Sequence, residues 1–304
     1  NNVKQRNYSS IAQLISDNTN GQIWGYTPNN ILCCYDLEAA RFSDYFDLDA
    51  STTLLSSRYQ SSKGTWISSA DFGVRFISVK EGKMQSIDFT PQNGKLLDTH
   101  KLNFGEDGRN NIWIASDKGV NLITPDFKSR IILKNKKIIV MTCDGSHIAL
   151  LTDKGEAFLY NDHAQLIKNS QLPSMLGFVG KSRASFFWQG WWYIFTQGET
   201  FAMNLKTGQF HKPALQIPNA MDKNQLKSYH FLYDKQGNAY LFDKKSALFK
   251  KFHLLDNPTY INARDKNFVA AESQDKKVYI TSYGSGFFVY DPKTDILQQF
   301  SVQN

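Results

Sequence analysis

The chain has 304 residues, of which 41% are hydrophobic and 14% aromatic, and its formal net charge is +7. This composition excludes a disordered chain, because it supplies enough apolar surface for a folded core. The lysines are spread through turn-like segments and form no basic stripe, so the charge predicts no nucleic-acid partner.

The sequence shows no pattern of a membrane-crossing or targeting segment. No apolar run approaches the roughly 20 residues of a spanning helix, and the start does not read as a signal peptide. We expect a soluble fragment, trimmed or mature, because the first residue is Asn1. Cys33, Cys34 and Cys143 exclude a disulfide framework, because one must stay unpaired and the adjacent two point to opposite faces of a strand.

A recurring pattern organises the chain: a polar turn, a short apolar run, a second turn and another apolar run. The centres of the first run align at Trp24, Trp66, Trp113, Ala149, Tyr193, Tyr240 and Tyr279. Their mean spacing of about 42 residues is the length of a four-stranded propeller blade. We therefore predict an all-β protein, a single seven-bladed β-propeller of four-stranded antiparallel blades over residues 1–304. The blades are expected near 10–48, 52–90, 98–136, 138–170, 178–214, 226–256 and 260–303.

The clearest copy runs from Glu106 to Ile123 and reads turn, strand, turn, strand. Its continuous apolar run Ile112–Ala115 predicts a strand covered on both faces, because a strand buried on one face alternates apolar with polar residues. Such blades stack face to face, and a closed ring completes the stacking. An open β-solenoid or a pair of β-sandwiches stays an alternative. The outer strand of the last blade is expected at Val3–Tyr8 or at Ile296–Val302.

Three of the copies share a more specific signature. The third copy, from Glu106 to Pro125, resembles the two-component regulator propeller repeat, Asp-x-x-Gly-x-Ile-Trp-Ile-Gly-Thr followed by a Gly-Leu-x-Arg-Tyr-like strand. The second copy, with Gly64–Ser69 and Phe72–Phe76, and the seventh, with Val278–Ser282 and Gly286–Pro292, are similar to it. The fourth to sixth copies match only in hydrophobic pattern and length, and most copies lack the Gly-Thr ending.

This resemblance implies the periplasmic sensor region of a Bacteroides-type hybrid two-component histidine kinase and response regulator. Such receptors commonly have two propellers, a small β-sandwich, a transmembrane helix, a cytoplasmic kinase and a DNA-binding response regulator, and they often control the use of complex glycans. The chain would then be a fragment of a larger inner-membrane receptor. Any kinase chemistry would lie outside it.

A search for chemistry gives no catalytic or metal residue and no cofactor. There is no nucleophile elbow, phosphate-binding loop or zincin helix, and the six histidines lack the short spacing of metal ligands. A propeller can still assemble a site from one residue per blade, and five carboxylates are expected to follow their blade's second strand: Asp71, Asp117, Asp153, Glu199 and Asp243. A polysaccharide lyase or glycoside hydrolase on the same scaffold therefore stays an alternative.

The densest aromatic cluster runs from Phe186 to Tyr193, with a turn at Gln189-Gly190 between two strands. Most of its rings are expected in the core, but an exposed Trp188 or Trp191 would suit a sugar ring. Three arginines, Arg75, Arg109 and Arg183, are candidates for an acidic or sulfated saccharide.

The leading prediction is a non-catalytic extracytoplasmic sensor that recognises a ligand, with a glycan or oligosaccharide as the candidate. Its partners would be a neighbouring propeller or β-sandwich of the same receptor, or a second copy of itself. Its signal would be a shift between two interface arrangements that the ligand binds with different affinity. A structural platform for protein interactions is the third alternative.

Overall fold

The computed structural model describes residues 13–17, 22–26, 31–36, 41–47, 57–69, 73–80, 83–100, 102–173, 185–195, 199–213, 221–226, 228–233, 238–245, 249–254, 268–282 and 286–300. Every regular element in these ranges is a β-strand, which confirms the all-β prediction. The chain divides into two compact units, residues 1–148 with 161–165 and residues 149–160 with 166–304.

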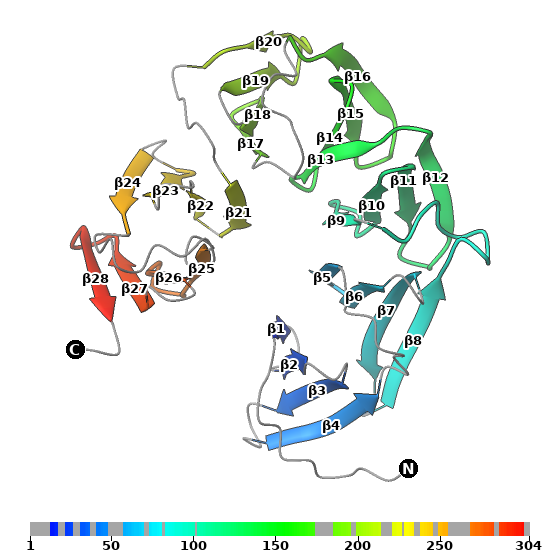
Figure 1. The fold of residues 1–304 in the computed structure, drawn as a ribbon, viewed down its shortest axis with the longest axis horizontal. Coiled ribbons are helices and arrows are strands. Elements are labelled where there is room, and N and C mark those ends of the chain that lie inside the picture. Colours follow the sequence, from blue (N-terminus) through cyan, green and yellow to red (C-terminus); the bar gives the residue numbers. More distant parts are fainter. Residues whose placement is uncertain are drawn as a thin grey trace. The chain divides into compact units, whose positions relative to one another are not determined.

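The strands of the described residues form seven four-stranded sheets, each with its strands in chain order (Figure 1). The first unit contains three of these sheets and the first strand of a fourth. Its strands are β1 (Gln13–Asp17), β2 (Gln22–Tyr26), β3 (Ile31–Asp36), β4 (Arg41–Asp47), β5 (Ser57–Ser61), β6 (Gly64–Ser69), β7 (Gly73–Lys80), β8 (Lys83–Phe89), β9 (Asn103–Glu106), β10 (Ile112–Ser116), β11 (Gly119–Ile123), β12 (Ser129–Lys134) and β13 (Ile138–Cys143). Neighbouring strands pair antiparallel, as in β5–β6–β7–β8.

The unit boundary falls within β14 (His147–Thr152), and the second unit contains the rest of the fourth sheet and three more sheets. Its strands are β15 (Glu156–Asn161), β16 (Leu166–Gln171), β17 (Ser185–Trp188), β18 (Trp191–Phe195), β19 (Thr200–Asn204), β20 (Phe210–His211), β21 (Met221–Gln225), β22 (Tyr229–Tyr233), β23 (Asn238–Asp243), β24 (Phe249–His253), β25 (Phe268–Glu272), β26 (Val278–Ser282), β27 (Gly286–Asp291) and β28 (Ile296–Phe300). The last sheet takes β28 as its fourth strand, paired with β27. The competing candidate, Val3–Tyr8, lies outside the described residues.

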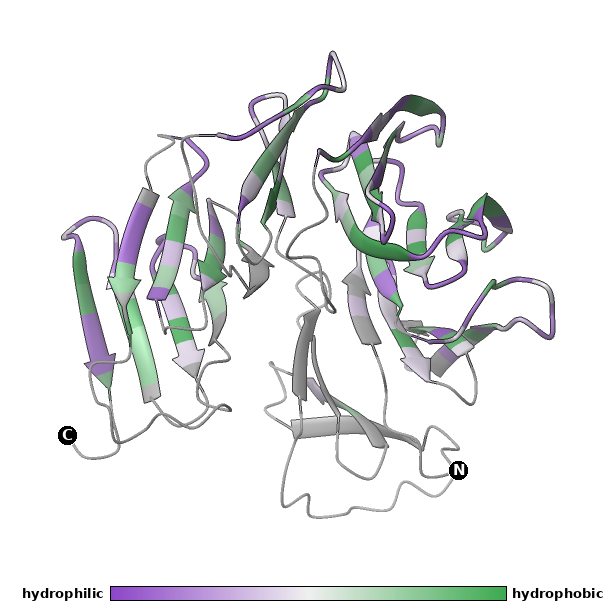
Figure 2. Cartoon of the chain, turned by 45° about the horizontal axis from the view of Figure 1, so that its top comes forward, coloured by the Kyte–Doolittle hydropathy of each residue, from purple (hydrophilic) through white to green (hydrophobic). Residues whose placement is uncertain are grey.

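Burial changes from the middle strands to the last strand in the sheets whose side chains the structure describes. Every residue of β10, β11 and β22 is buried, whereas most residues of β12, β16 and β28 are exposed or half-buried. Hydrophobic residues accordingly concentrate in the strands and hydrophilic ones in the connecting turns (Figure 2). The continuous apolar runs therefore mark strands that are covered on both faces, as predicted.

Neighbouring sheets of one unit share a core. In the first unit, Trp66, Phe76 and Phe89 of β6–β8 pack in one cluster with Ile112 and Ile114 of β10. In the second unit, sheet β21–β24 shares one cluster with β25–β28 and another with β17–β20. Sheets that stack face to face in this way bury the apolar faces of their central strands, which is the main stabilising term of the fold.

The aligned central residue lies on the second strand of its sheet in six of the seven copies, in β2, β6, β10, β14, β18 and β26. Tyr240 was aligned wrongly, because it lies on β23, the third strand, and Phe231 of β22 occupies the equivalent place. Both strands are continuous apolar runs, so hydrophobic pattern does not distinguish them. The sheet also begins at Met221, before the expected start at 226, because the polar strand β21 carries no apolar signal.

The glycine of the repeat signature allows the third strand to lie close to the fourth. Gly73 begins β7 and Gly119 begins β11, with φ angles of +77° and +140°. A Cβ atom would lie 2.5 Å from the carbonyl oxygen of Phe89 at Gly73, and 2.1 Å from that of Leu133 at Gly119. Only glycine avoids both the backbone strain and these contacts with the last strand.

A glutamate at the end of a sheet's first strand binds the first turn of the preceding sheet. Glu106, the last residue of β9, accepts hydrogen bonds from the Ser62 backbone N–H at 3.0 Å and from its hydroxyl at 2.5 Å. Glu272, the last residue of β25, accepts one from the Ser228 backbone N–H at 2.7 Å. The two contacts repeat the same geometry at one sheet junction in each unit.

We expect Glu106→Ala to lower the free energy of unfolding by about 1 kcal/mol, because the lost hydrogen bonds are solvent-exposed and water replaces them. Urea denaturation followed by tryptophan fluorescence measures the change. Glu199→Ala is the control, because it removes an exposed ion pair with Lys212. Equal effects of the two substitutions would contradict a specific role of Glu106 between the sheets.

Candidate functional site

The turn between β17 and β18 presents two tryptophans side by side. Trp188 and Trp191 are directly opposed across the hairpin, so their side chains start from the same face of the sheet. Gln189 and Gly190 between them have φ angles of +44° and +77°, as in the two-residue turns that match the twist of a hairpin. Both turn residues are exposed, and no atom lies within 4 Å of a Cβ placed on Gly190.

Trp188 is half-buried and held by aromatic rings. Its ring lies edge-on to Phe242 at 4.8 Å and 6.1 Å from Tyr193, measured between ring centroids. Its indole N–H is buried and makes no hydrogen bond to the described residues. Burial also raises the pKa of the Tyr193 hydroxyl, which keeps this neighbour neutral. The indole is thus fixed by packing rather than by hydrogen bonds.

Trp191 is half-buried on the other strand of the hairpin, where its ring lies edge-on to the His211 imidazole at 4.3 Å between centroids. The His211 Nδ1 lies 3.1 Å from the Ala202 carbonyl oxygen, which can only accept, so Nδ1 carries the proton. His211 is exposed and therefore places a polar ring beside the indole. An aromatic face with an adjacent polar group is the chemistry that binds a sugar ring.

Most of the other rings of the aromatic cluster are core, as predicted. Phe186, Trp192 and Tyr193 are buried, and Phe186 stacks on His230 at 4.2 Å between centroids. Trp188 and Trp191 pack against this core from its margin. Phe187 is also half-buried, but it neighbours Trp188 in the strand and lies on the opposite face. Trp188 and Trp191 are therefore the half-buried rings of this stretch that share one face, and this pair is the candidate for ligand contact.

The predicted arginines have other partners. Arg75 of β7 forms a two-pronged ion pair with Asp88 on β8, with Nε–Oδ1 at 2.6 Å and Nη2–Oδ2 at 2.9 Å. Its guanidinium is thus already engaged. Arg183 lies outside the described residues. Arg75 and Arg109 belong to the first unit and the two tryptophans to the second, so the structure does not describe a joint site.

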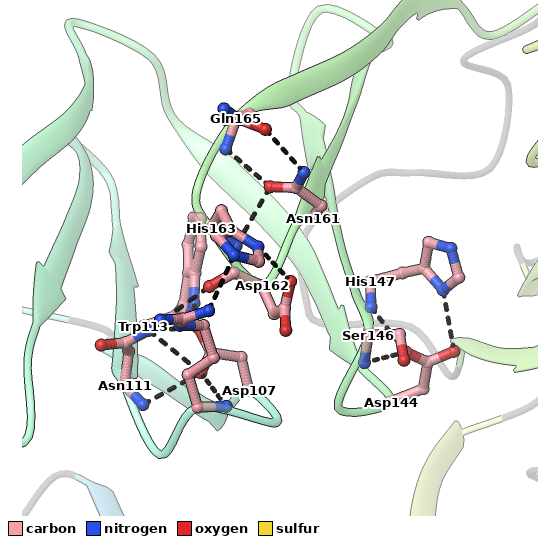
Figure 3. A network of polar contacts seen from close by, with 11 residues as sticks. Asp107, Asn111, Trp113, Asp144, Ser146, His147, Asn161, Asp162, His163 and Gln165 are labelled. Carbon is pink, nitrogen blue, oxygen red and sulfur yellow. Dashed lines mark hydrogen bonds and ion pairs between the residues drawn. The ribbon is translucent and has the colours of Figure 1, made fainter.

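Arg109 is exposed in the turn between β9 and β10, where it contacts His163. His163 in turn contacts Asp162 (Figure 3). Its Nη1 lies 2.7 Å from the His163 Nε2, and the His163 Nδ1 lies 2.8 Å from the Asp162 Oδ1. Arginine only donates, so Nε2 accepts and Nδ1 carries the proton toward the carboxylate. The three side chains join two turns of the first unit.

A buried aspartate in the same turn was not recognised from the sequence. Asp107 is 3% exposed, and its Oδ2 accepts the indole N–H of Trp113 at 2.8 Å (Figure 3). Its carboxylate also accepts the side-chain amide of Asn111 and the backbone N–H groups of Asn111 and Arg109. The signature Asp…Trp could have revealed the contact, because a buried indole N–H requires an acceptor. The role of this aspartate is structural.

Serine replaces this aspartate in the second sheet. The Ser61 hydroxyl accepts the Trp66 indole N–H at 3.1 Å and donates to the Gly64 carbonyl oxygen at 2.8 Å. In the fourth sheet, Ala149 stands in the tryptophan position, and Asp144 accepts hydrogen bonds from the backbone N–H groups of Ser146 and His147. The acceptor of the first turn and the tryptophan therefore vary independently: the second sheet keeps the indole with a serine acceptor, and the fourth keeps the aspartate without an indole.

The carboxylates expected to recur on one face do so only in part. Asp117 and Asp153 directly follow the second strands β10 and β14, and Glu199 comes after β18. Asp243 instead ends β23, the third strand of its sheet; its position was misjudged together with that of Tyr240, which lies on the same strand. Asp71 lies outside the described residues. Glu199 pairs with Lys212 at 2.5 Å.

Within the described ranges, His, Cys, Asp and Glu side chains nowhere gather in a group of three or more that could hold a metal ion. In the same ranges, the protein has no helix long and apolar enough to cross a membrane.

Four-stranded antiparallel sheets in chain order, with buried central strands and exposed last strands, are the architecture of β-propeller blades. No protein-family model matches the sequence, and no curated protein matches it. Solved structures do match, and the chain is similar to dihydro-heme d1 dehydrogenase NirN with a TM-score of 0.66, 8% identity and coverage of 95% of this chain.

Two similar structures come from B. thetaiotaomicron. The extracellular domain of a hybrid two component system matches with a TM-score of 0.59 and 15% identity over 92% of this chain. The extracellular domain of a one component system matches with a TM-score of 0.56 and 13% identity over 96% of it. The protein spans 65% of the NirN chain and 40% and 49% of the two extracellular domains. At these identities the likeness concerns the fold.

Proposed function

We propose that the chain is a non-catalytic, extracytoplasmic ligand-recognition propeller of a hybrid two-component signalling protein. The observation that carries the proposal is the likeness of its fold to the extracellular domains of a hybrid two component system and of a one component system, over more than nine tenths of its length. The resemblance of its second, third and seventh copies to the two-component regulator propeller repeat supports the same assignment.

In this proposal the sheets are the blades of one closed seven-bladed ring over residues 1–304. The mean repeat of about 42 residues and the four strands of each sheet support it. The ring would be the periplasmic part of an inner-membrane receptor, with a second propeller or a β-sandwich of the same receptor as its neighbour. The partial coverage of the two extracellular domains supports a longer receptor.

The proposed ligand is an oligosaccharide, and the proposed contact is the pair Trp188 and Trp191. A sugar ring stacks its C–H face on an indole, and the exposed His211 imidazole supplies a hydrogen bond to a hydroxyl. The tight turn and the packing of Trp188 on Phe242 hold the indoles in place before binding. A preorganised site loses less conformational entropy when the ligand binds.

Signal transfer in this proposal requires no chemistry in the chain. The ligand would favour one of two arrangements of the chain against its partner, to the extent of its difference in affinity for them. A protein of this kind binds its ligand and leaves it unchanged.

Isothermal titration calorimetry against a panel of neutral and acidic oligosaccharides tests the proposal. We expect at least one oligosaccharide to bind, and Trp191→Ala to weaken its affinity by about tenfold, or ~1.4 kcal/mol. Tyr279→Ala is the matched control, because Tyr279 is another half-buried ring on a second strand, in another sheet. It should leave the affinity unchanged.

Three results would overturn parts of this proposal. Binding that is equally weakened by both substitutions would exclude the hairpin as the site. Cleavage of an oligosaccharide by the purified chain would favour the lyase or hydrolase alternative. A chain that binds no saccharide but still associates with partner domains would be an interaction platform.

A further inference from the structure

The large hydrophobic side chains that are exposed among the described residues all lie on the last strands of their sheets. They are Ile131 of β12, Leu166 and Ile167 of β16, and Ile296 and Phe300 of β28. On β28 the two side chains are 52% and 51% exposed and lie four residues apart, on the same face of the strand. Gln298 lies between them on that face and is also exposed.

β28 differs from the other last strands in its charge. The other last strands longer than two residues all carry Lys, Arg or Asp: Arg41, Asp44 and Asp47 in β4, Lys83 and Asp88 in β8, Arg130 and Lys134 in β12, Lys168 in β16, and Lys250 and Lys251 in β24. β28, with the sequence ILQQF, carries none. Charged residues on an edge strand prevent pairing with another chain, and a two-residue edge such as β20 is too short to pair.

Within the described residues β28 is the end strand of its sheet, bonded to β27 on one side. We propose that this edge pairs antiparallel with β28 of a second copy of the chain, forming a two-fold symmetric dimer. The pattern of the strand is self-complementary about Gln298: Ile296 of one copy faces Phe300 of the other, and the two Gln298 side chains face each other on the axis. An isologous contact requires this self-matching.

The charge pattern supports a second copy of the chain as the partner that pairs with β28. The chain has a formal net charge of +7, so two copies repel each other over most of their surfaces. Five consecutive uncharged residues provide an edge where this repulsion is small and where main-chain hydrogen bonds and two Ile–Phe cross-strand pairs form. On β24, by contrast, the same geometry centred on Lys251 would place the Lys251 side chains of the two copies opposite each other.

The dimer deepens the proposed function, since it assigns to β28 the surface through which a receptor chain would meet its second copy. The proposed dimer depends only on the residue pattern of β28 and not on saccharide binding. Loss of the dimer and loss of saccharide binding are separate measurements on separate sheets.

Analytical ultracentrifugation from about 1 to about 100 µM tests the proposal, a range that detects dissociation constants typical of small interfaces. We expect the unsubstituted chain to dimerise, and Gln298→Lys to raise the dissociation constant by about tenfold or more, since like charges then meet on the axis. Gln298→Glu alone should do the same. An equimolar mixture of the two variants should dimerise again, because lysine then faces glutamate.

Ile131→Lys is the matched control, because Ile131 is similarly exposed on β12, which already carries charges. It should leave association unchanged. A chain that stays monomeric at about 100 µM overturns the proposal. A dimer that Ile131→Lys weakens as much as Gln298→Lys does, or variants that fail to restore association when mixed, would also overturn it. Circular dichroism checks that each variant folds.

Discussion

Replacing Gly119 by alanine is expected to lower the free energy of unfolding by about 3–4 kcal/mol, because two costs add at this position. Its φ angle of +140° lies in a region that other residues scarcely adopt. A methyl group would also lie 2.1 Å from the Leu133 carbonyl oxygen, which belongs to the backbone of β12 and cannot rotate away. Urea denaturation followed by circular dichroism measures the loss.

Gly94→Ala separates these two costs. Gly94 also has a positive φ angle, +71°, but no atom lies within 4 Å of the position that a Cβ atom would take there. Alanine there should cost only about 1 kcal/mol, the ordinary strain of a left-handed conformation. If Gly119→Ala lowers the free energy of unfolding no more than Gly94→Ala does, the close approach of β11 and β12 is not the reason that Gly119 must be glycine.

Replacing Asp107 by alanine is the second change with a large expected effect, a loss of about 3–4 kcal/mol in the free energy of unfolding. The substitution removes the carboxylate that accepts the buried indole N–H of Trp113, and it leaves the side-chain amide of Asn111 with the Asp162 carbonyl oxygen at 3.5 Å. It also removes the acceptor of two backbone N–H groups in the turn. Denaturation followed by tryptophan fluorescence measures both the stability and the environment of the indole.

Ser61→Ala is the matched comparison, because Ser61 accepts the indole N–H of Trp66 in the equivalent turn. It removes a neutral hydroxyl, which accepts the indole N–H and donates to the Gly64 carbonyl oxygen, and it should cost about 1 kcal/mol. If Asp107→Ala lowers the free energy of unfolding no more than Ser61→Ala does, the hydrogen bonds of the Asp107 carboxylate do not stabilise its turn as we propose. In the Asp107→Ala background we expect Trp113→Phe to restore part of the lost stability, because it removes the indole N–H that has lost the carboxylate. If the carboxylate is not important, Trp113→Phe should restore little stability.

These two positions explain the residues of the repeat signature in physical terms. Its aspartate accepts the indole N–H of the tryptophan, and its glycine lets the third strand approach the fourth. Both are requirements of a sheet that must stack on its neighbours. The signature therefore indicates a fold more strongly than it indicates a ligand, and the proposed ligand contact, Trp188 and Trp191, lies outside the signature.

Much of the candidate site could be expected from the aromatic cluster, but not all of it. The turn at Gln189-Gly190 could be predicted, since glycine after a polar residue favours a two-residue hairpin. Which rings stay exposed depends on Phe242, which is distant along the chain, and on His211. The arginines show the same limit, because the partner of Arg75 is set by the register that places Asp88 opposite it.

The amino-acid sequence by itself determined the strand content and the repeat of about 42 residues, because strand period and turn chemistry are local properties of the chain. Only the tertiary structure decided that Phe231, and not Tyr240, occupies the central position of its sheet, since two adjacent apolar strands look alike until their pairing is known. It also decided that Asp107 is buried under an indole, that Arg75 is engaged, and that β28 ends its sheet as an uncharged edge. Each of these depends on contacts between residues distant in sequence, which local patterns do not encode.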